Sequence, residues 1–374
     1  MMAVGFSTTE SLASPRMGLM TTPRGEVRTP AYLPFAARGA IGSLRPSDLR
    51  GLGAQALSVS LYGLLSRPGL DAIESLGGAH AFMAWDGPLL ADPGDAEIAR
   101  LGAPDAVPDS GRRTRGGQGR VIRLNERGVE FSSYVDGAIS RLTPEDFVTA
   151  QRRMGADAGR SAWIEAERPP GTSVPNTGEW ARRSLFQAEQ VAFPLFVTLN
   201  GVAGMADAAS EGAFGFARLA IDQLEADWWP ASEHPRLVVG EQGPVELLLT
   251  FAAGADLVSG NSPLRAAARG IAFTRWGQFS LTNDVRTDDP RPLVIGCPCS
   301  TCEFAARGYL RHLFETDEMV APTLLAQHNL SVMLRLERAA REWIADGCFR
   351  AEAGRFLADY RDDGERASER AARL

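Results

Sequence analysis

The sequence contains no lysine, so arginine supplies every fixed positive side-chain charge in its 374 residues. Acidic residues outnumber arginines by 46 to 39, and the formal net charge is −7. That balance does not favour a generally nucleic-acid-binding chain, although local arginine clusters can still bind phosphate. No run approaches the roughly 20 apolar residues of a membrane span. The first 30 residues also lack the charged start and apolar core of a signal peptide. We therefore expect a cytoplasmic protein with no membrane partner.

Cysteine is scarce as well, and its placement is uneven. Three of the four cysteines, Cys297, Cys299 and Cys302, fall within six residues. Such close neighbours pair poorly as disulfides, whereas a tetrahedral zinc ion takes thiolates from one tight turn and a further ligand from a distant segment. Two helical patterns downstream predict a hairpin that returns this last ligand to the turn. The candidates for it, on spacing alone, are His328, His312 and Cys348.

Short apolar runs alternate with helical patterns through most of the chain. Such alternation predicts an α/β fold with a parallel sheet and right-handed crossovers. At this length a (β/α)₈ barrel is the leading architecture, and its reactive groups should follow the carboxyl ends of the strands. The residues at such ends include Asn200, Gly240 and Ser259. The predicted strands are 56–61, 194–199, 213–219, 236–239 and 255–258, and two Pro/Gly-rich loops are predicted at 103–119 and 168–179.

A set of motifs spread from Gly25 to Phe349 carries a more specific signal than any single residue. The motifs include Thr29–Pro34, Arg67–Gly69, Gly77–Met83, Leu142–Glu145, Pro263–Thr274, Tyr309–Leu313 and His328–Leu330. Together with the cysteine turn they resemble the tRNA-guanine transglycosylase family. Members of this family are zinc-containing barrel enzymes that exchange guanine in tRNA for a 7-deazaguanine base. The resemblance covers nearly the whole chain.

The resemblance implies a single barrel over residues 1–374 with a zinc-binding helical subdomain at 286–350. It implies a structural zinc ion, because four protein ligands leave no open position for water. It further implies the tRNA anticodon loop as a partner, a 7-deazaguanine-type base as a ligand, and a dimer formed through the zinc side, either a homodimer or a heterodimer with a catalytic paralogue. The ligands that it implies for zinc are Cys297, Cys299, Cys302 and His328.

Base exchange at a ribose requires a carboxylate nucleophile and an acid/base group for the purine. The resemblance assigns the acid/base position to Asp92, in a segment Asp92–Glu97 where the family has Asp-Ser-Gly-Gly-Phe-Gln. It places Ser259 at the position of the nucleophilic aspartate. A serine hydroxyl attacks only with a paired base, so the substitution predicts weakened or lost catalysis. Asp95 is a possible substitute carboxylate.

At the positions where the family binds the base and the RNA, this sequence has only some of the family's residues. The phosphate-binding candidates are Arg265 and Arg269, for which surface ion pairs are the alternative. The candidate substrate-binding residues are Ser60, Glu165, Asn200, Gly201 and Gly240.

We therefore predict a divergent family member that acts as a tRNA-binding or non-catalytic partner subunit. One alternative is an active transglycosylase with a rearranged site that uses Asp92 and Asp95 or Ser259. Another is a barrel that binds a purine-like small molecule without RNA.

Overall fold

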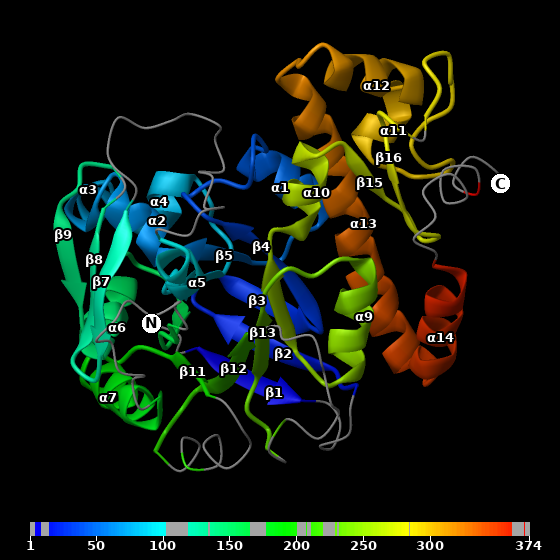
Figure 1. Ribbon diagram of the computed structural model, residues 1–374. Helices are drawn as coiled ribbons and strands as arrows, with labels where there is room; N and C mark the ends of the chain where they lie inside the picture. The colour runs from blue at the N-terminus through cyan, green and yellow to red at the C-terminus, as the bar shows by residue number, and fades with distance from the viewer. Residues whose placement is uncertain are drawn as a thin grey trace.

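Eight parallel strands close into a barrel in the order β10-β11-β12-β13-β14-β4-β5-β6 (Figure 1). The computed structural model describes residues 4–8, 15–101, 119–133, 135–164, 177–199, 207, 211–219, 229, 232–283, 285–360 and 370. The predicted α/β barrel is confirmed, while the loop predicted at 103–119 lies almost entirely outside the described residues. The barrel strands are β4 (Ala31–Ala36), β5 (Leu57–Ser60), β6 (Leu89–Asp92), β10 (Ala158–Arg160), β11 (Leu195–Thr198), β12 (Gly215–Leu219), β13 (Arg236–Val239) and β14 (Leu257–Gly260).

The interior of the barrel has two layers of different character. Side chains alternate along a strand, so residues two apart share a face. A deep layer is apolar and includes Leu33, Leu90, Ala158, Phe196, Ala217, Leu237 and Leu257. On five of these strands, the residue two positions further toward the carboxyl end points into the barrel as well. These residues are Asp92, Arg160, Thr198, Val239 and Ser259. The polar groups of the barrel interior therefore gather at the carboxyl end of the strands.

A three-stranded antiparallel sheet covers the opposite, amino-terminal end of the barrel. It consists of β1 (Gly5–Thr8), β2 (Gly18–Thr22) and β3 (Gly25–Thr29). Met20 and Val27 from this sheet pack against the deep apolar layer. Asp256 lies at this end too, directly before β14, and pairs with the buried Arg16 at 2.6 Å. Asp256 is thus three residues and most of a strand away from Ser259.

A second antiparallel sheet follows β6, on the carboxyl-terminal side of the barrel. It contains β7 (Arg120–Asn125), β8 (Gly128–Ser132) and β9 (Ile139–Leu142) and lies to one side of the molecule in Figure 1. Its inner face packs into the main core through Leu124, Val129 and Phe131. Its outer face carries exposed side chains, among them Arg123, Ile139 and Arg141.

Helices alternate with the barrel strands and then form the carboxyl-terminal region. Of the two helical patterns predicted after the cysteine turn, Phe304–Leu313 and Val320–Leu336, the first begins only at Arg307, because Ala305 and Ala306 have extended backbone angles. Beside these helices lies a small hairpin of β15 (Ile271–Phe273) and β16 (Gln278–Ser280). The helices are α1 (Pro46–Leu52), α2 (Leu61–Ser66), α3 (Leu70–Ser75), α4 (Gly78–Met83), α5 (Asp95–Ala99), α6 (Pro144–Arg153), α7 (Thr177–Gln190), α9 (Pro244–Ala252), α10 (Ser262–Ala268), α11 (Ser300–Phe304), α12 (Arg307–Glu315), α13 (Val320–Ala345) and α14 (Phe349–Asp359).

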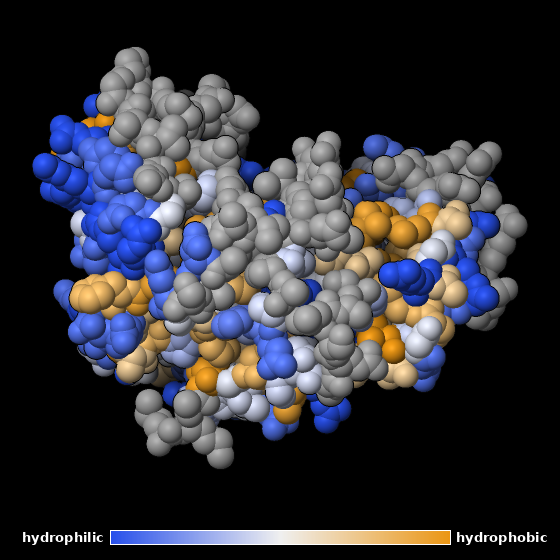
Figure 2. Space-filling model, turned by 90° about the horizontal axis from the view of Figure 1, so that it is seen from below, coloured by the Kyte–Doolittle hydropathy of each residue, from blue (hydrophilic) through white to orange (hydrophobic). Residues whose placement is uncertain are grey.

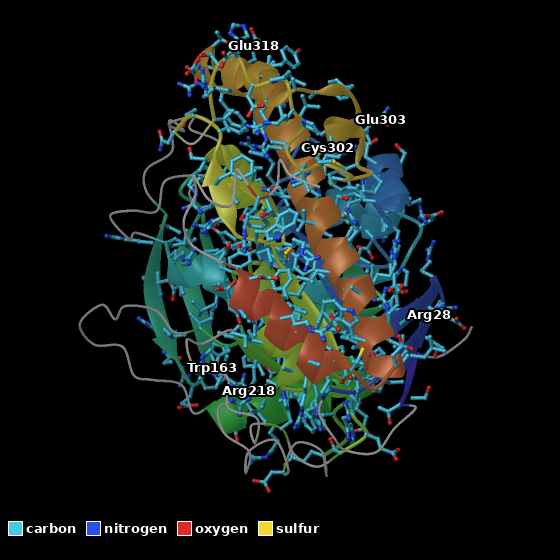
Figure 3. All side chains as sticks on the ribbon, turned by 90° about the vertical axis from the view of Figure 1, so that its right-hand side faces the viewer. Arg28, Trp163, Arg218, Cys302, Glu303 and Glu318 are labelled. Carbon is cyan, nitrogen blue, oxygen red and sulfur yellow. The ribbon has the colours of Figure 1, made fainter. Side chains whose placement is uncertain are left out.

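The long helix α13 connects the cysteine turn to the barrel. Its Asn329 accepts a hydrogen bond from the Phe273 amide at 2.8 Å and donates to the carbonyl of Ile271. Two turns further on, the buried Glu337 accepts hydrogen bonds from the Tyr32 amide and from Arg341. Figure 3 shows Cys302 beside one part of this helix and Arg28 near its other end. One rigid element therefore fixes the position of the cysteine turn relative to β4.

Across the residues that the structure describes, no helix combines the length and the apolar character that a bilayer crossing requires.

Candidate functional site

Arg160 occupies the centre of the polar layer at the carboxyl end of the barrel. It ends β10, which pairs directly with β6, and its side chain is only 1% exposed. Its Nη2 lies 2.8 Å from Asp92 Oδ2 and 2.7 Å from Asp95 Oδ1. Its Nη1 donates to Asp95 Oδ2 at 2.8 Å and to the hydroxyl of Thr198 at 3.1 Å. One buried guanidinium thus bridges two buried carboxylates and three strands.

Backbone amides also donate hydrogen bonds to the carboxylate oxygens of Asp92 and Asp95. Asp92 Oδ1 accepts from the Gly94 amide at 2.8 Å, and Asp95 accepts from the amides of Ala96 and Trp163. All four oxygen atoms of the two carboxylates therefore have hydrogen-bond donors. Burial raises the pKa of Asp92, and the neighbouring charge of Asp95 adds to this, although Arg160 opposes both. Burial alone would lower the pKa of Arg160, but the two carboxylates outweigh it and raise that pKa. The arrangement is a buried ion cluster.

Glu97 adds a third acidic group next to this cluster. It lies on α5, where the family pattern has a glutamine, and it accepts a hydrogen bond from the hydroxyl of Ser60. Ser60 also accepts from the Gly63 amide at 3.0 Å and so caps α2. Burial raises the pKa of Glu97 to about 8, and the charges of Asp92 and Asp95 raise it further, against the effects of Ser60 and Arg38. Glu97 is therefore mostly protonated at neutral pH.

Ser259 points into the same end of the barrel, and no base of the described residues lies within hydrogen-bond reach of its hydroxyl. The residue is fully buried, and within the described residues its Oγ has no hydrogen-bond partner. A serine nucleophile requires a base within hydrogen-bond reach. The contacts of the buried histidines are elsewhere: His80 faces the carbonyls of Gly155 and Gly87, and His328 faces the cysteine turn.

Among the described residues, the other predicted site residues follow β13 or lie on α10 or at its end. Gly240 donates its amide to the carbonyl of Ser259 at 2.9 Å and lies at the end of β13. Arg265 pairs with Glu241 at 2.9 Å, with both side chains close to half exposed. Arg269 is exposed at the end of α10. Three predicted substrate-binding residues lie outside the described residues: Glu165, Asn200 and Gly201.

The cysteine turn forms the second candidate site. The Nδ1 atom of His328 lies 3.8, 3.5 and 3.3 Å from the sulfur atoms of Cys297, Cys299 and Cys302. The four ligand atoms all lie within 4.8 Å of one another. The opposite ring nitrogen of His328 is 2.9 Å from the Phe273 carbonyl, which fixes the ring and leaves Nδ1 free to bind a metal. Within the described residues the group contains neither His312 nor Cys348. These four side chains can hold one metal ion.

Sequence reasoning missed Arg160 and Glu97. A signal existed in the segment Ala158-Gly159-Arg160, because an arginine inside a short apolar strand must find carboxylates when it is buried. The strand has only three residues, however, and neither its existence nor its inward face could be recognised from so short a pattern.

Comparison with known proteins identifies relatives of the whole chain. A family described as "Queuine tRNA-ribosyltransferase" matches residues 11–204 and 218–362. A protein of that name from a Ruegeria species is 32% identical over 376 residues, which covers 92% of this chain and 94% of its own. A second, from Thermus thermophilus, is 32% identical over 362 residues, with 89% of this chain and 88% of its own covered. A third, from Sphingopyxis alaskensis, is 30% identical and covers 95% of this chain and 98% of its own.

Replacing Arg160 by Met should destabilise the fold strongly. The change leaves two buried carboxylates without a cation, for which we expect a loss of about 3–5 kcal/mol in the free energy of unfolding. Urea denaturation followed by circular dichroism measures it. The triple variant R160M/D92N/D95N should recover most of the loss, because no uncompensated charge remains. Arg45→Met, in the exposed pair with Asp48, should change little. A stable single variant would contradict the buried cluster.

Glu97 should make stability depend on pH. Its pKa in the folded state, about 8, exceeds the value of roughly 4.3 expected when unfolded. The folded state therefore keeps a proton that the unfolded state releases, and stability declines as pH rises between those values, by at most about 1.4 kcal/mol per pH unit. Urea titrations at several pH values should show a smaller decline for Glu97→Gln. Glu26→Gln, at an exposed position on β3, is the control, and equal slopes for all three proteins would contradict the assignment.

Proposed function

Because the chain belongs to the queuine tRNA-ribosyltransferase family, we propose that it binds tRNA but has weakened or lost base exchange. In this proposal it serves the exchange of guanine for a 7-deazaguanine base as a tRNA-binding or non-catalytic partner of a catalytic paralogue. The barrel and the metal turn are retained for binding and assembly. The chemistry at the ribose is left to the partner.

The ion cluster around Arg160 is the observation that carries the proposal. A covalent exchange needs a carboxylate that is free to attack the ribose and another group that moves a proton on the purine. Asp92 and Asp95 are buried, and every oxygen atom of both is engaged by Arg160 or by a backbone amide. Freeing either one would break a buried ion pair, which is costly. Both are thus poorly suited to the roles that the family chemistry assigns to carboxylates.

The alternatives have less support from the same geometry. An active rearranged site would use Asp92 with Asp95 or Ser259, but every oxygen of the two carboxylates has a donor and the hydroxyl has no hydrogen-bond partner among the described residues. A purine-like small molecule would need open space in the barrel mouth, where the Arg160 side chain is only 1% exposed.

We infer that the metal is zinc, held by the cysteine turn and His328. For zinc with sulfur ligands at about 2.3 Å and nitrogen at about 2.1 Å, a tetrahedral site places sulfur and nitrogen about 3.6 Å apart. The three distances of 3.8, 3.5 and 3.3 Å bracket this value. When bound, the ion would be structural, since it has four protein ligands. It would link α11 to α13 and thus to the barrel.

Exposed apolar side chains support a protein partner on the metal side. Phe304 on α11 and Tyr309 on α12 are 63% and 48% exposed, and Met319, which precedes α13, is 89% exposed. Large apolar residues exposed on one part of a chain are a common feature of interaction sites. A homodimer or a heterodimer with a catalytic paralogue through this side accounts for them.

The proposal is tested by measuring binding and exchange on one preparation. We expect the protein to bind an unmodified tRNA transcript in a filter assay and to incorporate labelled guanine on the order of 10⁴-fold more slowly than the Thermus thermophilus relative. Ser259→Ala should leave any residual rate unchanged. Exchange within about tenfold of the relative would overturn the loss of catalysis, and a drop caused by Ser259→Ala would favour the rearranged site.

The metal is tested separately. Elemental analysis after dialysis should find about one zinc ion per chain, and His328→Ala should lower this content sharply and weaken the folding of the surrounding region, because binding and folding are coupled. His312→Ala is the matched control, since His312 lies outside the cluster. Full zinc retention in His328→Ala would contradict the ligand set.

A further inference from the structure

The outward face of the β7–β8–β9 sheet carries a row of charged residues that the site does not use. Cross-strand pairing places Arg123 opposite Glu130, and Glu130 opposite Arg141. The inward face of the same strands is apolar and packed. Arg120 lies one row away on the outward face, and Arg127 lies in the turn between β7 and β8. In Figure 2, hydrophilic side chains gather on the side of the molecule where this sheet lies.

Three arginines of this face have no partner for their guanidinium groups within the described part of the chain. Among the described residues, the guanidinium groups of Arg123, Arg127 and Arg141 have neither a hydrogen bond nor an ion pair. Some exposed arginines elsewhere are paired with nearby acids, as Arg182 is with Glu179, while others, such as Arg269, have no ion pair within the described residues. What sets these three apart is that they lie together on one small sheet and its turn.

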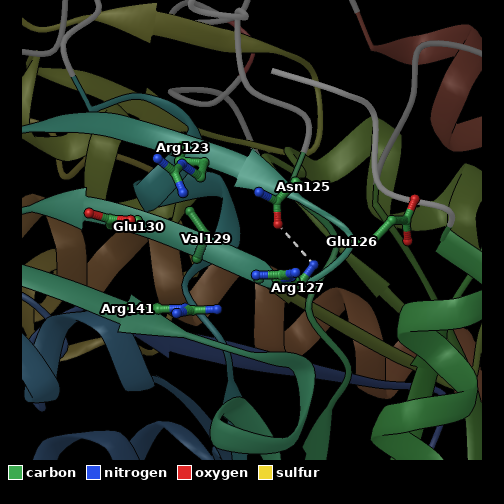
Figure 4. Close-up of a pocket in the computed structure, with 8 residues that line it drawn as sticks. Arg123, Asn125, Glu126, Arg127, Val129, Glu130 and Arg141 are labelled. Carbon is green, nitrogen blue, oxygen red and sulfur yellow. Dashed lines mark hydrogen bonds between the residues drawn. The ribbon is translucent and has the colours of Figure 1, made fainter. Parts of the chain in front are cut away.

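The same three arginines line one hollow. Its volume is about 240 Å³, and its lining comes from β7, β8, β9 and the connecting turn. Figure 4 shows the side chains of Arg127 and Arg141 pointing toward one another, with Glu126 and Glu130 on either side of them. The turn is held by the Asn125 side chain, which accepts a hydrogen bond from the Arg127 amide at 2.9 Å. Two guanidinium groups that face each other repel unless an anion lies between them.

The chemistry of the hollow favours a phosphodiester over a small organic ligand. Small-molecule pockets are usually larger, about 300–1,000 Å³, and mostly apolar. Arginine forks match phosphate oxygens in shape and charge. In the chain the sheet comes after β6 and α5, and β6 ends at Asp92 at the mouth of the barrel. An RNA strand whose target base lay at the barrel mouth would therefore run close to this face.

We propose that the outward face of the β7–β8–β9 sheet, through Arg123, Arg127 and Arg141, binds phosphates of the tRNA that flank the nucleotide at the barrel mouth. This inference rests on the proposed tRNA binding and adds the surface that supplies it. Such contacts carry no sequence information, and they position the RNA backbone. They also explain how a chain with a net charge of −7 can attract RNA locally.

The test is the salt dependence of tRNA binding, measured by fluorescence anisotropy with a labelled unmodified transcript. Each phosphate contact contributes about 0.7–0.9 to the slope of log K against log salt concentration. The variant R123A/R127A/R141A should therefore have a slope smaller by about 2, and an affinity lower by about tenfold or more at roughly 100 mM salt. Circular dichroism should show unchanged folding, because all three side chains are exposed.

Two controls separate this surface from a general charge effect. The variant R24A/R182A/R355A removes the same charge from exposed positions on a β2–β3 turn, α7 and α14, and it should keep the wild-type slope. The variant R123K/R127K/R141K keeps the charge and should keep the slope while binding somewhat more weakly.

The outcomes distinguish this inference from the proposed function. If the wild-type protein binds tRNA and the two alanine variants have the same slope, the surface is wrong and tRNA binding stands. If the wild-type protein does not bind the transcript, both the surface and the proposed tRNA binding fail.

Discussion

The buried contact between Arg160 and two carboxylates determines how the mouth of this barrel can be used. Arg160 extends from the inner face of β10 and reaches Asp92 at the end of β6 and Asp95 at the start of α5. A buried cation and buried anions can coexist only when each is fully paired. The contact joins adjacent strands and fixes the first turn after β6. The same pairing takes up the groups that acid/base chemistry would require.

The rest of the molecule holds the cysteine turn rigidly against the barrel. The helix α13 makes buried hydrogen bonds to the β15 segment through Asn329 and to β4 through Glu337. His328, on the same helix, faces the three cysteine sulfur atoms. A metal in that turn would therefore stabilise the position of a 26-residue helix against the barrel. The four side chains grouped here are the ligand set that the family resemblance implied.

The sequence predicted the family and the barrel, and both are confirmed, because these depend on many motifs and on strand–helix alternation spread over the whole chain. Spacing alone identified the three cysteines of the turn as metal ligands, and the family resemblance selected His328 as the fourth ligand. The ion cluster was not predicted. Its central residue lies on a strand of three residues, and only the pairing of β10 with β6 reveals that Arg160 and Asp92 face each other. The burial of Ser259 likewise results from the closure of the barrel, and the sequence around Ser259 contains no pattern from which that burial could be predicted.

The most direct measurement of the central claim is a covalent trapping experiment. Base exchange in this family holds the ribose on the enzyme, so incubation with labelled tRNA should leave an adduct that survives denaturing gel electrophoresis if a nucleophile is present. We predict no such band for this protein under conditions in which the Thermus thermophilus relative gives one. A band that appears with the wild-type chain and disappears in Asp95→Asn or Ser259→Ala would show that the barrel mouth still provides a nucleophile, and would contradict the account.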